Sequence, residues 1–470
     1  MSSANTLQSF LHFTPTADQA YAMYALERFV LSKKNNCTFV LRGYAGTGKT
    51  TLVAALTQYL LSVGRKSVSL APTGRAAKVM TQYSKKRSTT IHKHIYTRVE
   101  LDHGGWFFEL KDNKHVDTLF IVDEASMIGG ETSEGLRPGK SLMEDLFNYV
   151  FSGKRCRLLF VGDEAQLPPV GLALSPALDV SYLRDYYGGT VGGVALSQVL
   201  RQSLTSGILQ NATHVRSLIE TDKPKVALVE TDDVQLISGA DLMEDIESAY
   251  DTDGMQEVVF ITRSNKTANL INQQIRHQIL WREDELEVGD LLMVVKNNYH
   301  WMNTIQKKSE FIANGETLEV LSIEKREKKY GFHFADVWVK LCDHPEQLEL
   351  EITIWLDTLM CEGAAMSDKQ YMLLLETIKQ QDAQEEKKVI GKSQLKTNKY
   401  LQAIQVKFAY ALTCHKSQGG QWQTVFVEHG YLTEEQVNDE WLRWLYTALT
   451  RAKQRLFLVN FQPFLLAASP

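Results

Sequence analysis

Nearly continuous apolar runs alternate with helical patterns along the first two hundred residues. Four of these runs predict buried strands at 38–42, 67–71, 118–122 and 157–161. Strands that are apolar on both faces and separated by helices indicate a parallel sheet covered by helices on both sides. The loops that follow the strands should therefore meet at one edge of the sheet, where ligands bind in such folds.

The same alternation returns later in the chain. A strand at 257–262 and a helix at 266–280 begin a second sheet, and apolar runs after Lys407 are expected to complete it. Between them, short runs of alternating character predict a small antiparallel barrel. The polar segment 369–388 has helical period and predicts an exposed surface helix. Two strand-like runs around Gly104 and Gly105 predict a β-hairpin.

The chain has 470 residues, which corresponds to two to four domains. The predicted fold class is α/β, with two P-loop-type lobes, a β-hairpin insertion in the first lobe and a β-barrel insertion in the second. We place the first lobe at 1–190 with its hairpin at about 96–117, the second lobe at 191–285 and 400–470, and the barrel at 286–399.

Composition restricts the class of protein. Lys and Arg number 51 against 56 Asp and Glu, so the net charge of −5 excludes nucleic-acid binding by bulk electrostatics and requires a local groove. The five cysteines form no C-x-x-C pair, so neither a zinc site nor a disulfide framework is indicated. The chain has no secretion signal and no membrane-spanning apolar run. We expect a cytoplasmic protein that makes no membrane contact and works as a monomer.

The sequence GYAGTGKTT at 43–51 matches the pattern G-x-x-x-x-G-K-[ST] between a predicted strand and a helix. Glycines let the backbone N–H groups curl around phosphates, and the following helix presents its positive end to them. Lys49 is expected to reach the β- and γ-phosphates, and Thr50 to ligate Mg²⁺. The predicted cofactors are therefore ATP and Mg²⁺, with the nucleotide held by Gly43, Ala45, Gly46, Thr47, Gly48, Lys49, Thr50 and Thr51.

Acidic and amide residues follow two further strands. Asp123 and Glu124 end the run LFIVDE, where Asp123 is placed to hold Mg²⁺ and Glu124 to activate the attacking water. After the next strand, Gln166 can hydrogen-bond the γ-phosphate or its water. In isolation, an ordinary turn fixed by Pro168 and Pro169 would be the better interpretation. Because three such loops converge on one crevice, we predict nucleotide hydrolysis.

Taken in order from about 14 to 458, these motifs resemble the superfamily 1 DNA helicases, specifically the RecD/Dda-like group that moves 5′ to 3′. The resemblance implies two RecA-like lobes with ATP between them, DNA across the top and an SH3-like inserted barrel. It implies that Gln19 reads adenine and that Gly419 lies near the nucleotide. It also makes Arg201 and Arg451 arginine fingers of the second lobe, which reach the γ-phosphate only when the lobes close.

The resemblance also implies contacts with single-stranded DNA in the segments APTGRAAK, TTIHKHI and TCHKSQGGQW. The residues concerned are Pro72, Thr73, Arg75, Thr90, His92, Thr413, His415 and Ser417. In the hairpin, Trp106 and Phe108 are candidates for a wedge that splits an incoming duplex, and a local aromatic core is an equal alternative. The expected partners are single-stranded DNA and junctions with duplex DNA, in DNA replication, recombination or repair.

Two rival functions remain open. A DNA-stimulated ATPase or translocase, or a nucleotide-gated DNA-binding protein, would need the same motor but would not unwind. Replacing the hairpin aromatics by Ala discriminates, because a pure translocase has no strand separation to lose. A P-loop kinase for a small molecule is the remote alternative, and it needs neither Gln166 nor two distant arginines. DNA-independent consumption of ATP with a small phosphate acceptor would favour it.

Overall fold

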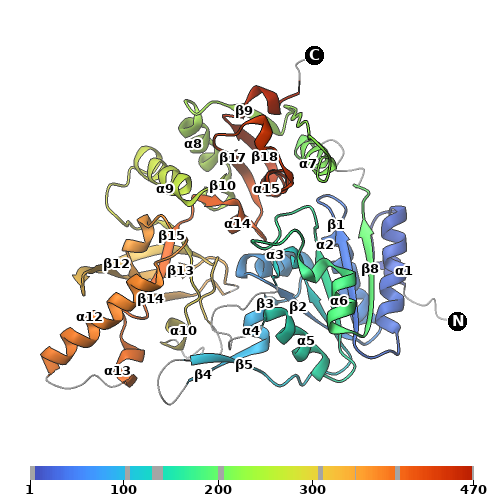
Figure 1. Ribbon diagram of the computed structural model, residues 1–470, viewed down its shortest axis with the longest axis horizontal. Helices are drawn as coiled ribbons and strands as arrows, with labels where there is room; N and C mark the ends of the chain where they lie inside the picture. Colours follow the sequence, from blue (N-terminus) through green and yellow to red (C-terminus); the bar gives the residue numbers. More distant parts are fainter. Residues whose placement is uncertain are drawn as a thin grey trace.

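The computed structural model describes residues 6–100, 106–129, 141–199, 206–304, 311–344, 346–386 and 392–467. They form two lobes, each built around a parallel sheet, with a β-barrel beside the second lobe (Figure 1). The hairpin, β4 (Tyr96–Glu100) paired antiparallel with β5 (Trp106–Leu110), extends from the first lobe. This arrangement confirms the predicted α/β class with its two insertions.

The first lobe contains a six-stranded sheet in the order β3-β2-β6-β7-β1-β8, with every pairing parallel. The four strands predicted here are confirmed. Its strands are β1 (Cys37–Gly43), β2 (Lys66–Ala71), β3 (Ser88–Thr90), β6 (Thr118–Val122), β7 (Arg157–Gly162) and β8 (Thr190–Leu196). Because β8 pairs with β1 along its whole length, the first lobe extends beyond the boundary predicted at 190.

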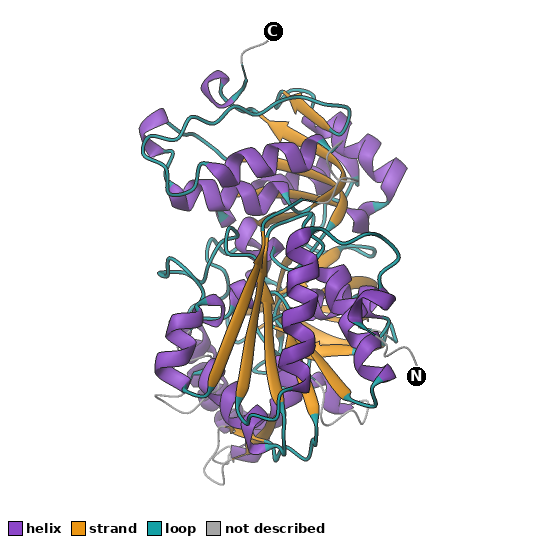
Figure 2. Cartoon of the chain, turned by 90° about the vertical axis from the view of Figure 1, so that its right-hand side faces the viewer, coloured by secondary structure: helices purple, strands orange, loops and turns teal. Residues whose placement is uncertain are grey.

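Helices cover both faces of this sheet (Figure 2). One apolar core packs α1 and α2 on one face, and a second packs α4 to α6 on the other, which explains why the strands are apolar on both sides. Hydroxyl side chains at the N-caps of α1, α3 and α4 accept hydrogen bonds from the first turn and fix where these helices begin. The helices are α1 (Ala17–Leu31), α2 (Lys49–Ser62), α3 (Gly74–Ser84), α4 (Ile91–Ile95), α5 (Leu142–Ser152) and α6 (Val180–Tyr187).

The second lobe contains a five-stranded parallel sheet in the order β16-β10-β17-β18-β9. The predicted strand and helix after residue 257 are confirmed as β10 and α9, and α9 continues into a π-helical turn at Ile275–Ile279. Its strands are β9 (Val234–Ile237), β10 (Val258–Thr262), β16 (Ala411–Thr413), β17 (Trp422–Glu428) and β18 (Ala452–Val459). Its helices are α7 (Gly207–Ser217), α8 (Leu242–Asp253), α9 (Asn265–Gln274), α14 (Cys414–Ser417) and α15 (Asp439–Leu449).

The insertion is a closed barrel of β11 to β15. Its strands are β11 (Leu291–Val294), β12 (Thr317–Lys329), β13 (Phe332–Leu341), β14 (Glu349–Trp355) and β15 (Ile404–Phe408). The predicted boundary at 399 is too early, because β15 pairs with β11 and β14 and so closes the barrel instead of joining the second sheet. The short helices α10 (Trp301–Thr304), α11 (Asp357–Met360) and α13 (Lys392–Thr397) belong to the same region.

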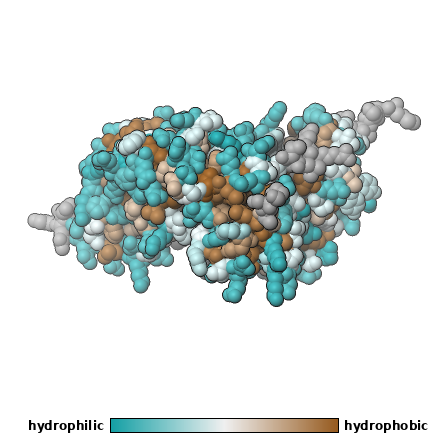
Figure 3. Space-filling view, turned by 90° about the horizontal axis from the view of Figure 1, so that it is seen from above, coloured by the Kyte–Doolittle hydropathy of each residue, from teal (hydrophilic) through white to brown (hydrophobic). Residues whose placement is uncertain are grey.

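The helix predicted at 369–388 is confirmed as α12 (Asp368–Glu386), but it is not a free surface helix. Leu374 and Ile378 are fully buried against an aromatic cluster on the barrel. Elsewhere the surface is mixed. The face seen from above has hydrophobic patches surrounded by hydrophilic side chains (Figure 3). No helix in the described parts of the chain has both the length and the apolar character needed to cross a bilayer.

Candidate active site and nucleic-acid interface

The loop between β1 and α2 has the backbone shape that the glycine pattern predicted. Gly46 and Gly48 adopt positive φ angles of 74° and 82°, a conformation that side chains with a Cβ rarely tolerate. The turn places Lys49 at the first position of α2. Its amine donates hydrogen bonds to the carbonyls of Gly43 (2.5 Å) and Tyr44 (2.9 Å), so the ammonium lies in the mouth of the loop.

Gln19 is fixed against this loop. Its side-chain nitrogen donates to the carbonyl of Thr47 at 3.0 Å, while its side-chain oxygen accepts from the backbone of Thr16 in the capping box of α1. The structure therefore brings Gln19 to the phosphate loop. Its role in reading adenine stays a prediction, because the hydrogen bonds described for it go to the protein backbone.

Asp123 and Glu124 follow β6 at the same edge of the sheet. The backbone N–H of Asp123 donates to the carbonyl of Leu70 in β2, and its carboxylate accepts from the N–H of Glu124 at 2.9 Å. Burial and the neighbouring Glu124 raise the pKa of Asp123 to about 7, against the opposing effect of Lys49. Glu124 itself has a left-handed backbone, with φ of 51°. Two adjacent carboxylates in a half-buried position create an electrostatic cost that a cation relieves.

This donor set fits Mg²⁺. Mg²⁺ is usually bound through one or two carboxylates together with substrate phosphates and water, rather than by a cage of protein ligands. The described residues contain no group of three or more His, Cys, Asp or Glu that would make such a cage. Asp123, with the hydroxyl of Thr50 at the start of α2, supplies the oxygen ligands that this kind of site requires.

The third loop brings Asp163 and Gln166 to the same place. Asp163 is 1% exposed, and its carboxylate lies 3.8 Å from the amine of Lys49. Gln166 is also buried, and its side-chain oxygen has no hydrogen-bond partner within the described residues. A buried amide oxygen without a partner is costly unless a ligand or water completes it. This geometry suits the predicted contact with a γ-phosphate or its attacking water.

The second lobe reaches into this site through α15. The hydroxyl of Tyr446 donates to the carboxylate of Asp163 at 2.7 Å and accepts from the backbone N–H of Ala45 at 2.8 Å. One residue further on, the hydroxyl of Thr447 accepts from the N–H of Leu167 at 2.8 Å. Sequence reasoning missed both residues, although they lie in the segment YTALTRAK, where only the arginine had been singled out.

The two predicted arginine fingers have different outcomes. Arg451 is 3% exposed, and its guanidinium donates to the carbonyls of Thr447 and Gly420 and to the hydroxyl of Thr450. All these partners belong to its own lobe, so its contact with phosphate stays a prediction. Arg201 lies outside the described residues.

Six of the eight segment residues predicted to contact DNA line one cavity of about 340 Å³ at the junction of both lobes and the barrel. Pro72, Thr73, Arg75, Thr90 and His92 come from the first lobe, and His415 from the second. The barrel side, which sequence reasoning did not assign, contributes Asn297, Phe311, Ala313, Asn314 and Gly315. Burial lowers the pKa of His92 to about 4, so its ring is neutral near pH 7 and can stack or hydrogen-bond but not pair ionically with phosphate.

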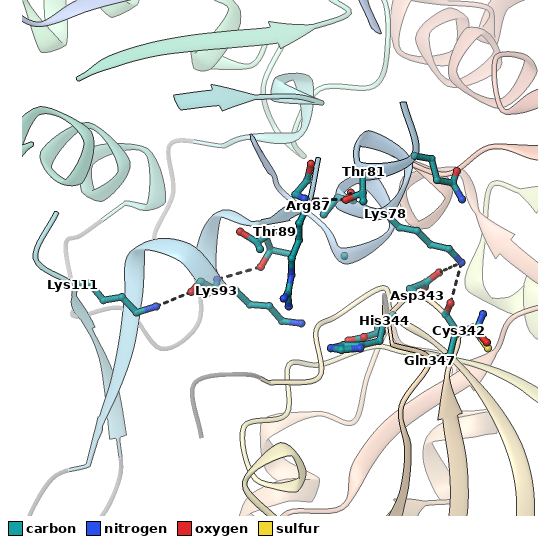
Figure 4. A pocket seen from close by; sticks show the side chains of 16 residues that line it. Lys78, Thr81, Arg87, Thr89, Lys93, Lys111, Cys342, Asp343, His344 and Gln347 are labelled. Carbon is teal, nitrogen blue, oxygen red and sulfur yellow. Dashed lines mark hydrogen bonds and ion pairs between the residues drawn. The ribbon is translucent and has the colours of Figure 1, made fainter. Parts of the chain in front are cut away.

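A second cavity of about 480 Å³ lies next to the first, and Thr90 lines both. It lies between α3 to β5 of the first lobe and the barrel loop around His344. Figure 4 shows Lys78, Arg87, Lys93 and Lys111 arriving from the first lobe and Asp343 from the barrel. The amine of Lys78 donates to the carboxylate of Asp343 at 3.2 Å and to the carbonyl of Cys342 at 3.0 Å. The junction thus gathers four cations beside two acidic residues, Glu316 and Asp343, despite the negative net charge of the chain.

Four of the predicted DNA contacts need correction or stay open. Ser417 is fully buried, and its hydroxyl donates to the carbonyl of Cys414, so it faces the lobe interior. Phe108 is 6% exposed, because its ring packs against Tyr96 and Tyr299, so the aromatic-core alternative holds for it. Thr413 ends β16 without lining either cavity. The side chain of Trp106 lies outside the described residues.

Arg75 lines the cavity but is not a free surface cation. Its guanidinium donates to the hydroxyl of Thr317 in the barrel at 2.6 Å and lies 4.7 Å from the ring centre of Trp422 in the second lobe. Burial lowers its pKa, although the guanidinium stays charged. Gly419 lies beside the same segment, since a Cβ there would meet Ala76 at 2.7 Å. The described contacts of Gly419 are thus with the DNA-side segment, and its place near nucleotide stays a prediction.

Two known families match the chain. The family described as "AAA domain" matches residues 16–241, and the family described as "UvrD-like helicase C-terminal domain" matches residues 408–459. The first match covers the phosphate loop, both acidic loops and the hairpin. The second covers β16, α14, β17, α15 and β18 of the second lobe. The two matches therefore include α1, β1, β6, β7 and α15, the elements that carry the nucleotide-site residues described above.

Curated relatives are similar over varying shares of the chain. The uncharacterized protein MJ1519 of Methanocaldococcus jannaschii is 26% identical over 92% of this chain and 37% of its own length. The ATP-dependent DNA helicase dda of Enterobacteria phage T4 is 25% identical over 66% of this chain and 68% of its own length. The ATP-dependent RecD2 DNA helicase of Deinococcus radiodurans is 32% identical over 37% of this chain and 21% of its own length.

The chain thus spans little more than a third of the first of these relatives. Among solved structures, the fold is similar to that of a Pif1 helicase described in work on DNA unwinding at forked double-stranded DNA. That similarity has a TM-score of 0.49 at 16% sequence identity, and it covers 97% of this chain and 95% of that chain.

Proposed function

We propose that this chain, which belongs to the superfamily 1 helicases, is an ATP-driven motor that moves along single-stranded DNA and unwinds duplexes. The observation that carries the proposal is the seam between the lobes. The phosphate loop and the Asp163 loop of the first lobe meet α15 of the second lobe there, through Tyr446 and Thr447. ATP hydrolysis at this seam can change the contacts between the two lobes.

In the proposed cycle, Lys49 binds the β- and γ-phosphates, and Glu124 takes a proton from the attacking water. Gln166, whose buried amide oxygen lacks a protein partner in the described residues, orients that water. Thr50 and Asp123 would hold Mg²⁺, which neutralises phosphate charge when bound. Arg451 and Arg201 are proposed to complete the charge stabilisation from the second lobe as the lobes close.

Single-stranded DNA is proposed to lie in the two neighbouring cavities between the lobes and the barrel, which Thr90 lines in common. The first is lined by both lobes, so a change at the seam alters the shape of the groove that holds the strand. The second adds cations suited to phosphates. His415, Phe311 and the neutral His92 are proposed to contact bases by stacking, which does not depend on base sequence. Alternating grip by the two lobes would then convert ATP hydrolysis into steps.

Direction and unwinding are the finer parts of the proposal. We propose movement from 5′ to 3′, on the resemblance to the RecD/Dda-like group. Strand separation is assigned to the hairpin, with Trp106 as the remaining candidate for the wedge. A DNA-stimulated translocase that does not unwind is the second candidate function. The burial of Phe108 in the first-lobe core favours it, because that ring cannot act as a wedge without leaving the core.

The test is strand displacement on duplexes that carry a single-stranded tail at either the 5′ or the 3′ end. We expect unwinding from the 5′ tail only, and loss of both unwinding and DNA-stimulated ATPase in Lys49→Ala. Unwinding from the 3′ tail would overturn the direction. ATPase without displacement would leave the translocase. ATP consumption that is independent of DNA and needs a small phosphate acceptor would favour a kinase and contradict the proposed motor function.

A further inference from the structure

The phenol of Tyr446 is the point at which the second lobe holds two parts of the nucleotide site together. It donates to the carboxylate of Asp163 at 2.7 Å and accepts from the N–H of Ala45 at 2.8 Å. We propose that Tyr446 is a positioning residue, which sets the phosphate loop and Asp163 in register with α15 and thereby couples the second lobe to phosphate cleavage. This inference rests on the proposed ATPase activity and adds a residue to which that reaction assigns no role.

The direction of the two hydrogen bonds is fixed by burial. Tyr446 is 1% exposed, and burial with the neighbouring Asp163 raises its pKa well above the ordinary value of 10.0. The hydroxyl therefore keeps its proton near pH 7. It donates to the carboxylate and has an oxygen lone pair for the N–H of Ala45. The bridge is a pair of hydrogen bonds and not a proton relay.

Asp163 is shared between Tyr446 and the phosphate-binding lysine. The same carboxylate oxygen that accepts from the phenol lies 3.8 Å from the amine of Lys49. Its second oxygen accepts from the N–H of Ala165 at 3.0 Å. Removing the phenolic hydroxyl would leave one buried carboxylate oxygen with Lys49 as its nearest donor. The expected consequence is that Lys49 spends more of its time on Asp163 and less on a phosphate.

Tyr446 also belongs to a short stretch of helix that carries other seam contacts. Thr447 accepts from Leu167 in the first lobe, and the guanidinium of Arg451 donates to the carbonyl of Thr447 at 2.9 Å. The position of Arg451 is thus tied to the same turn that Tyr446 fixes against the first lobe. The contacts of Tyr446 and Thr447 with the first lobe therefore set the starting position of Arg451 for any movement toward phosphate.

A purely structural role for this tyrosine can be separated from positioning, because the chain contains a matched residue. Tyr410 is also 1% exposed, donates to the buried Asp290 at 3.0 Å and accepts from the N–H of Leu291 at 3.1 Å. It also accepts from the guanidinium of Arg282 at 2.6 Å. Its bridge joins the second lobe to the barrel and does not reach the phosphate loop. Tyr410→Phe therefore controls for the loss of a buried hydroxyl that bridges a carboxylate and a backbone N–H away from the nucleotide site.

The experiment measures steady-state ATPase with saturating single-stranded DNA for wild type, Tyr446→Phe, Tyr410→Phe and Lys49→Ala in the full chain. We expect kcat of Tyr446→Phe to fall about tenfold or more, the size expected for a lost hydrogen bond to a charged group. KM for ATP should rise by less than kcat falls, because the contact of Lys49 with the phosphates, which Tyr446 protects, is strongest in the transition state. Tyr410→Phe should keep kcat.

A double variant tests whether Tyr446 acts on Lys49 through Asp163. If Tyr446 acts through Asp163, Tyr446→Phe combined with Asp163→Asn should be no slower than Asp163→Asn alone. Equal kcat for Tyr446→Phe and Tyr410→Phe, a rise in KM without a fall in kcat, or additive effects in the double variant would each overturn the proposal. Failure of the proposed function is distinguishable. In that case wild type has no DNA-stimulated ATPase for Lys49→Ala to abolish.

Discussion

Lys78 in α3 of the first lobe and Asp343 at the end of β13 in the barrel form an ion pair of 3.2 Å across the larger cavity (Figure 4). The Asp343 side chain is largely buried, whereas the Lys78 side chain is 38% exposed and can reach other partners. The contact links the two parts of the molecule that enclose the cavity. Through this contact, Asp343 neutralises an ammonium group that a phosphate in the same cavity would otherwise attract.

Asp343→Asn should therefore strengthen binding of single-stranded DNA, because Lys78 no longer has to leave a carboxylate. One additional phosphate contact steepens the dependence of log K on log salt by about 0.7 for a single strand. Fluorescence anisotropy of a labelled oligonucleotide at several salt concentrations measures both quantities. Asp117→Asn is the control, since it breaks an exposed pair with Arg155 at the N-terminal ends of β6 and β7. Weaker binding by Asp343→Asn would show that DNA does not use Lys78.

Phe108 should behave as a core residue. Its ring stacks on Tyr96 at 5.1 Å and meets Tyr299 edge-on at 5.2 Å, so truncation leaves a cavity where the hairpin joins the lobe. Phe108→Ala should lower the free energy of unfolding by about 3 to 5 kcal/mol, measured by urea titration with far-UV circular dichroism.

The matched variant is Trp106→Ala, two positions earlier in the same strand. It should lose strand displacement while retaining DNA-stimulated ATPase if Trp106 is the wedge. A Phe108→Ala protein of unchanged stability that no longer separates strands would reverse this assignment and return the wedge to Phe108.

The parts of the site that were predictable are those encoded in short contiguous motifs. The phosphate loop is specified locally, because its glycines and the Lys49 that follows them act within one turn of the chain. Asp123 and Gln166 were also predictable, since each follows an apolar run and parallel strands deliver their ends to one edge. None of these inferences needed knowledge of a contact between distant segments.

The missed or corrected parts depend on which way a side chain points after the lobes have packed. His415 and Ser417 stand two positions apart in α14, so they lie on different sides of the helix and only one can face the groove. In the sequence, Tyr446 looks like one more apolar helix residue, and its role becomes visible only when the fold places Asp163 opposite it. The apolar run of β15 resembles a strand of the second sheet, and only its pairing with β11 shows that it closes the barrel.

The barrel and the second lobe should resist separation because of a buried charge cluster. Asp290, fully buried, accepts hydrogen bonds from Arg276 at 3.0 Å and from Arg282 at 2.7 Å. Asp290→Asn leaves two guanidinium groups without their counter-ion and should cost about 3 to 5 kcal/mol. Differential scanning calorimetry should show a lower midpoint. Asp284→Asn, which removes only the exposed pair with Arg326, should cost less than about 1 kcal/mol. Similar costs for both variants would contradict the idea that this cluster fixes the barrel.

His94 should make the first lobe sensitive to mild acid. Burial, with further contributions from His115 and Lys111, lowers its pKa from 6.5 to about 4. The ring packs among His115, Phe120 and Tyr149, where the surroundings favour the neutral form. Between these two pKa values the unfolded chain binds a proton that the folded chain does not. The stabilisation is therefore complete above pH 6.5 and is lost as the pH falls toward 4.

Over that interval a single histidine of this kind changes the free energy of unfolding by on the order of 3 kcal/mol. His94→Gln cannot take up the proton, so its unfolding free energy should fall less steeply between pH 6.5 and 4 than that of wild type, even if it is less stable at pH 7. Urea titrations at several pH values measure the slopes. His277→Gln is the matched control, because it makes the same substitution at an exposed position of the second lobe. Parallel curves for wild type and His94→Gln would show that His94 does not carry the acid sensitivity.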